Sequence, residues 1–354
     1  MNQKPILINI VSGKGGTGKS LTTAVLGRLL AQEGASVLLV DLDIFVRGLT
    51  HFFYLYKKER RRITVNTTAA DWFGLSDRKS DSLEIAKERF FEVDLLPAVS
   101  EIEEELNYSE GRCFNPELID KLFQQLRMTE YDIILLDNRA GIDDFILSCC
   151  HLSSISISVS ESDPVSRTTN DNLLRHLKRS RTPKVYTLLN KVRYLRTLDD
   201  YKSAIEQIQS DYEIIGQVPF DVDLFEIFGR PGFWDQANST KYAYGIAEAW
   251  NKLAHREEIP TFVDLKRFPE HKIWPISSQA GIFANRFERM SVSAGFLFLI
   301  SYLIFDKVLM SGRTYWVDLL LVYSIGLIAL PFFRHLVWNP ELLARKKISN
   351  KKKE

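Results

Sequence analysis

The chain has 354 residues, 26% of them charged, and a net charge of +1, so it carries no overall acidic or basic bias. This length allows one large α/β domain with additional elements. Its three cysteines have no paired spacing, which argues against a disulfide framework and favours a reducing compartment; they are Cys113, Cys149 and Cys150. We expect no signal peptide, and we expect Cys149 and Cys150 to be buried on a helix.

A glycine-rich segment near the start carries the strongest signal. An apolar run at 6–11 precedes it and a helical stretch at 21–32 follows, and between them lies Gly13-Lys14-Gly15-Gly16-Thr17-Gly18-Lys19-Ser20. Strand, glycine loop and helix start form the context of a phosphate-binding loop, in which backbone N–H groups and the helix N-terminus face phosphate oxygens. We expect Lys19 to reach the β- and γ-phosphates and Ser20 to bind Mg²⁺. The predicted nucleotide-binding residues are those eight and Leu21.

Two apolar strands end in carboxylates. Asp41 and Asp43 follow the strand predicted at 36–40, and Asp137 follows the strand predicted at 132–136. The carboxyl ends of parallel strands meet at one edge of a sheet, where ligands bind. We therefore predict that Ser20, Asp41 and Asp137 hold Mg²⁺ and that Asp43 orients a water molecule toward the γ-phosphate. The alternative for Asp137 is a helix N-cap.

A later strand end offers candidate contacts to a base. Asn190 and Lys191 follow the strand predicted at 185–189, and Pro219 follows the strand predicted at 214–218. An Asn side chain presents both a donor and an acceptor, which suits the edge of an adenine ring. Ordinary turn chemistry is the alternative for these residues.

The remaining pattern alternates apolar runs with helical periods over residues 1–255, which predicts an α/β fold with a mostly parallel sheet flanked by helices. The other strands are expected at 93–96 and 155–159, and the other helices at 116–128, 166–179, 198–209 and 243–253. We interpret the polar segment 57–92 as an irregular insertion over the sheet edge.

The C-terminal part differs in composition. We predict a connector at 256–289, a transmembrane helical hairpin at 290–338 with spans at about 290–310 and 315–335, and a basic tail at 339–354. Arginines and lysines flank the pair of spans, which predicts an inner-membrane protein with the nucleotide-binding domain and both termini in the cytoplasm. A buried helical hairpin or an oligomer interface is the alternative for this segment.

These motifs, in this order, resemble the MinD/ParA family of P-loop ATPases, the deviant Walker A group of the SIMIBI class, over roughly residues 5–255. The loop resembles that family's KGGxGK[ST] motif, Val40-Asp41-Leu42-Asp43 its first switch, and Leu136-Asp137-Asn138-Arg139-Ala140-Gly141 its Walker B strand and second switch. The resemblance implies ATP and Mg²⁺ as cofactors, catalytic roles for Lys14, Lys19 and Asp43, and switch residues Asp41, Asp43, Asp137, Arg139 and Gly141.

The same resemblance implies a homodimer or higher oligomer that sandwiches ATP, with Lys14 crossing to the partner's phosphates, and slow hydrolysis that a protein partner stimulates. The chain departs from the family pattern at Ile44-Phe45-Val46-Arg47 and at Asn138-Arg139. We expect a membrane-anchored ATP switch that positions, assembles or gates a partner complex, with the lipid bilayer as a partner and nucleic acid not among them. The alternatives are a tyrosine-kinase-like phosphotransferase and the ATPase subunit of a membrane pore or defence assembly.

Overall fold

The computed structural model describes residues 4–55, 67–76, 88–90, 92–107, 115–161, 163–180, 182, 184–192, 213–228, 230, 232–268, 294 and 325. The chain divides into two compact units. The first comprises Met1–Arg193 and Ile205–Ile273, and the second comprises Tyr194–Ala204 and Trp274–Glu354. Only Ala294 and Ile325 of the second unit are described.

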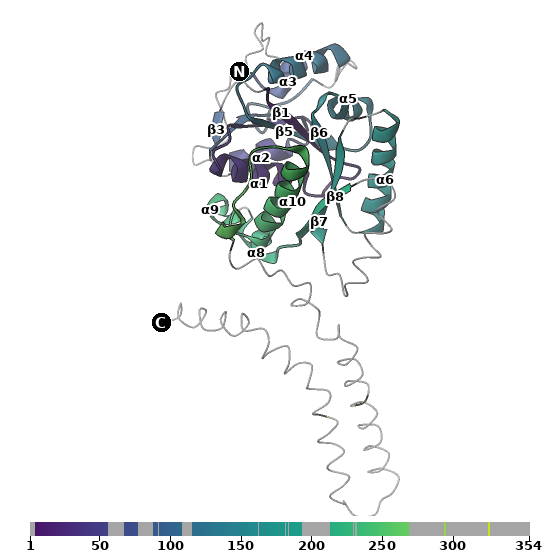
Figure 1. Ribbon diagram of the computed structural model, residues 1–354. Helices are drawn as coiled ribbons and strands as arrows, with labels where there is room; N and C mark the ends of the chain where they lie inside the picture. Colours follow the sequence, from purple (N-terminus) through teal and green to yellow (C-terminus); the bar gives the residue numbers. More distant parts are fainter. Residues whose placement is uncertain are drawn as a thin grey trace, which may run out of the picture. The chain divides into compact units, whose positions relative to one another are not determined.

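The first unit is built on an eight-stranded sheet with the order β3-β4-β2-β5-β1-β6-β7-β8 (Figure 1). Among the strands of the described residues, only β3 runs antiparallel to its neighbour. In β2 all five residues are buried, as expected for a parallel strand that helices cover on both faces. The strands are β1 (Ile6–Ser12), β2 (Val37–Asp41), β3 (Glu88–Phe90), β4 (Val93–Leu96), β5 (Ile133–Ala140), β6 (Ile155–Glu161), β7 (Val185–Val192) and β8 (Glu213–Pro219).

Helices form a separate apolar core on each face of the sheet. Alternate residues of β1 belong to different cores: Ile8 and Ile10 to one, Leu7 and Val11 to the other. The first core includes α1 (Lys19–Gln32), α2 (Gly48–Leu55), α8 (Val222–Ile227), α9 (Phe233–Ala237) and α10 (Lys241–Glu257). The second includes α3 (Ala69–Trp72), α4 (Pro116–Arg127), α5 (Asp144–Leu152) and α6 (Pro164–Arg179).

The structure confirms all seven predicted strands, with ends that differ by a few residues, and the α/β class. The interpretation of 57–92 as wholly irregular was wrong, because α3 and β3 lie within it; Thr68 and Asp71 form a capping box that starts α3. Cys149 and Cys150 lie buried on α5 with free thiols, as expected. The helix predicted at 198–209 lies outside the described residues.

The segment after α10 packs on the first unit as far as Phe268. Ile259, Val263 and Phe268 are buried, and the short 3-10 helix η1 (Leu265–Arg267) brings Arg267 to Glu33 at the end of α1, with 3.1 Å between the charged groups. The rest of the predicted connector, both predicted spans except Ala294 and Ile325, and the basic tail lie outside the described residues. Within the part of the chain that is described, no helix combines the length and the apolar character needed to cross a bilayer.

Candidate functional site

The glycine-rich loop joins the C-terminal end of β1 to the first turn of α1. Lys19 and Ser20 are the first two residues of α1, and Gly18 occupies the N-cap position without a side-chain cap. Its φ is 95°, a left-handed conformation that glycine adopts most readily. Because no side chain caps α1, its first N–H groups remain available to an anion at the helix N-terminus.

Three carboxylates lie beside this loop on neighbouring strands. Asp41, the last residue of β2, is paired in register with Asp137, which lies within β5, and both are fully buried. Asp43, two residues after Asp41, is 9% exposed. The predicted metal ligands and the predicted water-orienting residue are therefore brought to one edge of the sheet, as the sequence indicated.

Asp41 has little hydrogen-bonding capacity left. Its Oδ2 accepts from both the backbone N–H and the hydroxyl of Thr50, each at 2.7 Å, and its Oδ1 accepts from the N–H of Asp43 at 3.1 Å. The Thr50 hydroxyl in turn accepts from the N–H of Ala98 at 2.8 Å. Asp41 thus fixes the start of α2 and the position of Asp43 more directly than it faces a ligand.

Asp137 differs, because one of its oxygens is unsatisfied. Its Oδ1 accepts from the Thr23 hydroxyl at 3.5 Å, whereas Oδ2 is buried and has no hydrogen-bond partner among the described residues. Burial raises the pKa of Asp137 to about 7, against the opposing effect of the Lys19 charge and the nearby Ser20 hydroxyl. A buried, unpaired carboxylate oxygen beside a hydroxyl suits a hydrated cation, which would favour the ionised form.

The pKa values of the other two carboxyl groups are also raised. Burial is the main cause for Asp41, and the charge of Asp137 adds to it. Burial raises the pKa of Asp43 as well, while the charges of Lys19 and Arg139 and the N–H of Val46 act in the opposite direction. Three acidic groups in one buried site favour a bound cation as counter-charge.

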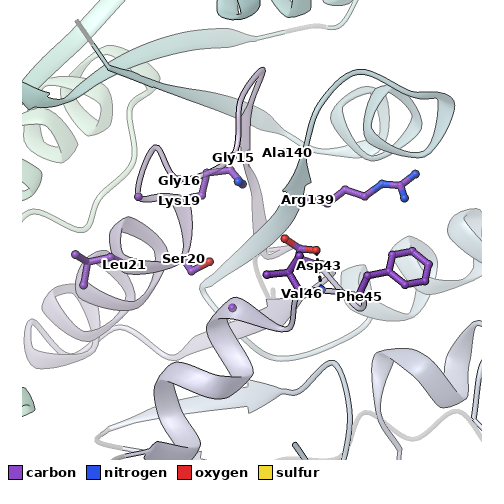
Figure 2. Close-up of a pocket in the computed structure, with 12 residues that line it drawn as sticks. Gly15, Gly16, Lys19, Ser20, Leu21, Asp43, Phe45, Val46, Arg139 and Ala140 are labelled. Carbon is purple, nitrogen blue, oxygen red and sulfur yellow. Dashed lines mark hydrogen bonds between the residues drawn. The ribbon is translucent and has the colours of Figure 1, made fainter. Parts of the chain in front are cut away.

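A pocket of about 460 Å³ opens beside the loop (Figure 2). Figure 2 shows Asp43 between the glycine loop and Arg139, whose guanidinium extends away from the loop. The lining residues are Gly15, Gly16, Gly18, Lys19, Ser20, Leu21, Asp43, Phe45, Val46, Gly48, Arg139 and Ala140. The sequence analysis did not predict Phe45, Val46, Gly48 and Ala140 as binding residues, although each lies within five residues of a predicted carboxylate.

The predicted second switch lies where β5 leaves the sheet. Arg139 pairs with Asp143 at 2.7 Å and lies over the rings of Phe45 and Phe145, at 6.0 and 5.6 Å from their centroids. The N–H of Gly141 donates to the carbonyl of Ser12 at 2.9 Å, so this segment is tied to the end of β1. Both residues stand at the edge of the site.

The three residues predicted to contact a base occupy the ends of β7 and β8. Asn190 is fully buried, and its amide donates to the Thr17 carbonyl at 2.7 Å. The Lys191 ammonium reaches the Gly16 carbonyl and pairs with Glu161 at 2.9 Å. Pro219 ends β8 in register with Val192. In this structure Asn190 and Lys191 therefore hold the loop, and their role toward a base stays a prediction.

Two further predicted residues of the loop face α6. Lys14 is half-exposed, with its ammonium 3.3 Å from the Ser166 hydroxyl and 3.7 Å from the Asp163 carboxylate. Gly13 lies against the α6 backbone, where a Cβ atom would overlap the carbonyl of Thr169. Lys14 is thus held by its own chain at the start of α6.

Comparisons with known proteins agree with this geometry. A candidate septum site-determining protein MinD of Oltmannsiellopsis viridis is 30% identical over 219 residues, which are 61% of this chain and 65% of that protein. The MinD of Buchnera aphidicola subsp. Schizaphis graminum is 26% identical over 259 residues, or 67% of this chain and 87% of that one. This chain therefore spans less than two thirds of the first relative.

A solved structure gives the same fold. The MinD of Pyrococcus horikoshii OT3, complexed with Mg-ADP, matches with a TM-score of 0.55 and 25% identity over 72% of this chain and 98% of that chain. The family model described as the CobQ/CobB/MinD/ParA nucleotide binding domain matches residues 8–230, which is more than half of the sequence. The chain therefore belongs to the family of CobQ/CobB/MinD/ParA nucleotide-binding domains.

Proposed function

We propose that this protein is a membrane-anchored molecular switch that binds and slowly hydrolyses ATP with Mg²⁺. One observation carries the proposal: the start of α1, which has no side-chain cap, lines a pocket together with Lys19, Ser20 and Asp43, and the buried Oδ2 of Asp137 has no hydrogen-bond partner within the described part of the chain. A triphosphate needs N–H donors and a cation, and the metal needs oxygen ligands. This site offers N–H donors at the start of α1, the Lys19 ammonium, and oxygen atoms of Ser20 and Asp43.

In this proposal the roles follow from position. The loop amides and Lys19 hold the phosphates, while Ser20 and Asp137 hold Mg²⁺, with Asp41 supporting them through Asp43 and Thr50. When bound, Mg²⁺ neutralises charge on the β- and γ-phosphates. Asp43 accepts a proton or a hydrogen bond from the attacking water. Burial raises the pKa of Asp43 above its ordinary value, which makes its carboxylate a stronger base for this role.

We further propose that ATP drives formation of a homodimer and that Lys14 is the deviant Walker A lysine. In the single chain Lys14 is held weakly, by a hydroxyl and a half-exposed carboxylate. Release from α6 would let its ammonium reach phosphates of the partner subunit, where a cation stabilises transferring charge. A protein partner is proposed to stimulate turnover, and nucleic acid is not among the proposed partners.

The membrane anchor is proposed from the sequence of 290–338. Two apolar runs with basic flanks fit a hairpin in the inner membrane, and the nucleotide-binding unit would then face the cytoplasm. Alkaline extraction of membranes that contain the full chain tests this part. Release of the protein into the soluble fraction would contradict the anchor and leave nucleotide binding untouched.

The nucleotide proposal is tested with the full chain and two lysine variants. Lys19→Ala should abolish binding of ATP with Mg²⁺, whereas Lys14→Ala should bind ATP and fail to dimerise. Binding is measured by calorimetry and the oligomeric state by light scattering, with ADP as the control nucleotide. Unchanged ATP affinity in Lys19→Ala would refute the site. Transfer of labelled phosphate to protein instead of water would favour the phosphotransferase alternative.

A further inference from the structure

The segment between Asp43 and α2 forms a closed turn. The N–H of Arg47 donates to the Asp43 carbonyl at 2.6 Å, and the N–H of Val46 donates to the Asp43 carboxylate at 3.4 Å. In addition, the Asp41 carboxylate accepts a hydrogen bond from the N–H of Asp43. The position of the Asp43 carboxylate therefore depends on the shape of residues 43–47.

The backbone of Arg47 has a left-handed conformation, which is unfavourable for a residue with a side chain. Its φ is 59°, in the left-handed region that is uncommon for a residue with a Cβ atom. Such a conformation costs about 1–3 kcal/mol and persists only where the surroundings over-determine it. At Arg47 the contacts of the side chain, which is 8% exposed, hold the backbone in this conformation.

The Arg47 guanidinium donates to three main-chain carbonyls. Its Nε bonds the carbonyl of Ile44 at 3.2 Å within the turn, while Nη1 and Nη2 bond the carbonyls of Ile102 and Glu104, each at 2.7 Å. Ile102 and Glu104 belong to the loop that follows β4. The rigid fork of a guanidinium can join two segments in this way, and the point charge of a lysine cannot.

The loop that receives Arg47 has its own internal support. The Glu104 carboxylate accepts from the N–H of Ser100 at 3.0 Å and from its hydroxyl at 2.8 Å. Leu106 is buried a little further along. The loop after β4 is thus a built anchor for Arg47.

Arg47 itself does not line the pocket, although its neighbours Val46 and Gly48 do. We propose that Arg47 is a positioning residue for ATP hydrolysis: it places Asp43 at the phosphate site and couples that placement to the loop at 100–107. The inference rests on the proposed function and adds the loop after β4 as an element through which turnover is set. The sequence Ile44-Phe45-Val46-Arg47, where the chain departs from the family pattern, thereby acquires a role.

The test uses the full chain and variants that separate the fork from the backbone. Arg47→Gly removes the guanidinium and relieves the left-handed conformation, and Arg47→Lys keeps the charge without the fork. Glu104→Ala removes the carboxylate that supports the loop after β4, while residue 47 remains arginine. Arg267→Ala is the matched control, since it removes an ion-paired arginine on a different surface.

Misplacement of a group near the reacting atoms lowers kcat more than affinity, so Arg47→Gly should lose about tenfold to a hundredfold in kcat. The ATP dissociation constant should stay within about twofold, because Lys19 and the loop are untouched. The kcat of Arg47→Lys should lie between that of Arg47→Gly and that of the unmodified chain. Glu104→Ala should also lower kcat, and its combination with Arg47→Gly should be less than additive because both act through one contact.

A second measurement does not depend on turnover. Hydrogen exchange of the Val46 and Arg47 amides should accelerate in Arg47→Gly and Glu104→Ala, with α1 and β5 unchanged. Unchanged kcat and exchange in Arg47→Gly would overturn the inference, as would equal losses of affinity and kcat. If the unmodified chain binds ATP without hydrolysing it, the proposed function fails and the role of Arg47 in turnover fails with it, whereas the exchange result still decides whether Arg47 holds the turn that positions Asp43.

Discussion

Three glycines of the phosphate loop allow the backbone geometry to be tested separately from the chemistry. Gly15 has no left-handed φ and an added Cβ atom would meet nothing within 4 Å. Gly16 has a φ of 79° and equally open surroundings. Gly18 has a φ of 95°, and its added Cβ atom would overlap the side-chain nitrogen of Asn190. Substitution by alanine at each position therefore adds one physical effect at a time.

The magnitudes follow from those effects. Gly15→Ala should be neutral or stabilise the fold by up to about 1 kcal/mol, because it reduces the entropy of the unfolded chain. Gly16→Ala should cost about 1–2 kcal/mol for a left-handed alanine. Gly18→Ala adds the displacement of the buried Asn190 amide from the Thr17 carbonyl, and an unsatisfied buried donor costs about 1–3 kcal/mol. The total loss of unfolding free energy in Gly18→Ala should be about 2–5 kcal/mol.

Urea unfolding of the full chain without nucleotide, followed by circular dichroism, measures the three free energies of unfolding. Nucleotide is left out because these backbone amides are proposed to bind phosphate, which would mix binding with folding. The order Gly15→Ala, Gly16→Ala, Gly18→Ala should be one of increasing loss. Equal stability of Gly15→Ala and Gly18→Ala would refute the reasoning from φ and from the Asn190 contact.

Two further predictions concern the buried carboxylate and the aromatic core. The pKa of Asp137 is raised to about 7, so its contribution to stability is present below the unfolded value of 3.8 and is lost as pH rises through about 7. Without Mg²⁺, unfolding free energies measured from pH 4 to 8 should thus fall less steeply in Asp137→Asn than in the unmodified chain, and equal slopes would contradict the assignment. Phe53 is fully buried and stacked on Trp234 at 5.1 Å, so Phe53→Ala should cost about 3–5 kcal/mol in urea unfolding. The control Phe262→Ala, at a position that is 46% exposed, should change stability by about 0.5 kcal/mol or less, and similar losses in both variants would contradict the packing.

The parts of the fold that could be predicted are those whose signal lies within one segment. Buried aliphatic runs marked the seven parallel strands, and the glycine loop marked the turn between β1 and α1. The start of α2 carries no such local signal, since the cap of its Thr50 N–H is the side chain of Asp41, nine residues earlier in another element. The short helix α3 was missed despite a local capping box, because the surrounding segment reads as polar.

The candidate site divides in the same way. The residue types and their strand-end positions indicated which carboxylates would gather, and the register of Asp41 beside Asp137 bears this out. Several hydrogen bonds that shape the site could not be predicted, because they join segments far apart in the chain. Asn190 reaches across 173 positions to Thr17, and Arg47 reaches 55 and 57 positions to Ile102 and Glu104. Such contacts depend on the order of the strands, which periodicity does not reveal.

The two paired carboxylates, Asp41 and Asp137, have different tasks in the candidate site. Asp41 accepts three hydrogen bonds and so fixes α2 and Asp43, whereas one buried oxygen of Asp137 finds no hydrogen-bond partner among the described residues. A buried carboxylate oxygen without a hydrogen-bond partner lowers the stability of the fold, and a cation that satisfies it would return that free energy as binding. If the roles were exchanged, a metal ion would compete with the bonds that hold Asp43. The hydrogen-bond pattern therefore favours Asp137 over Asp41 as the carboxylate that would face the hydrated metal ion of the proposed function, and it gives Asp41 the task of holding Asp43 and α2.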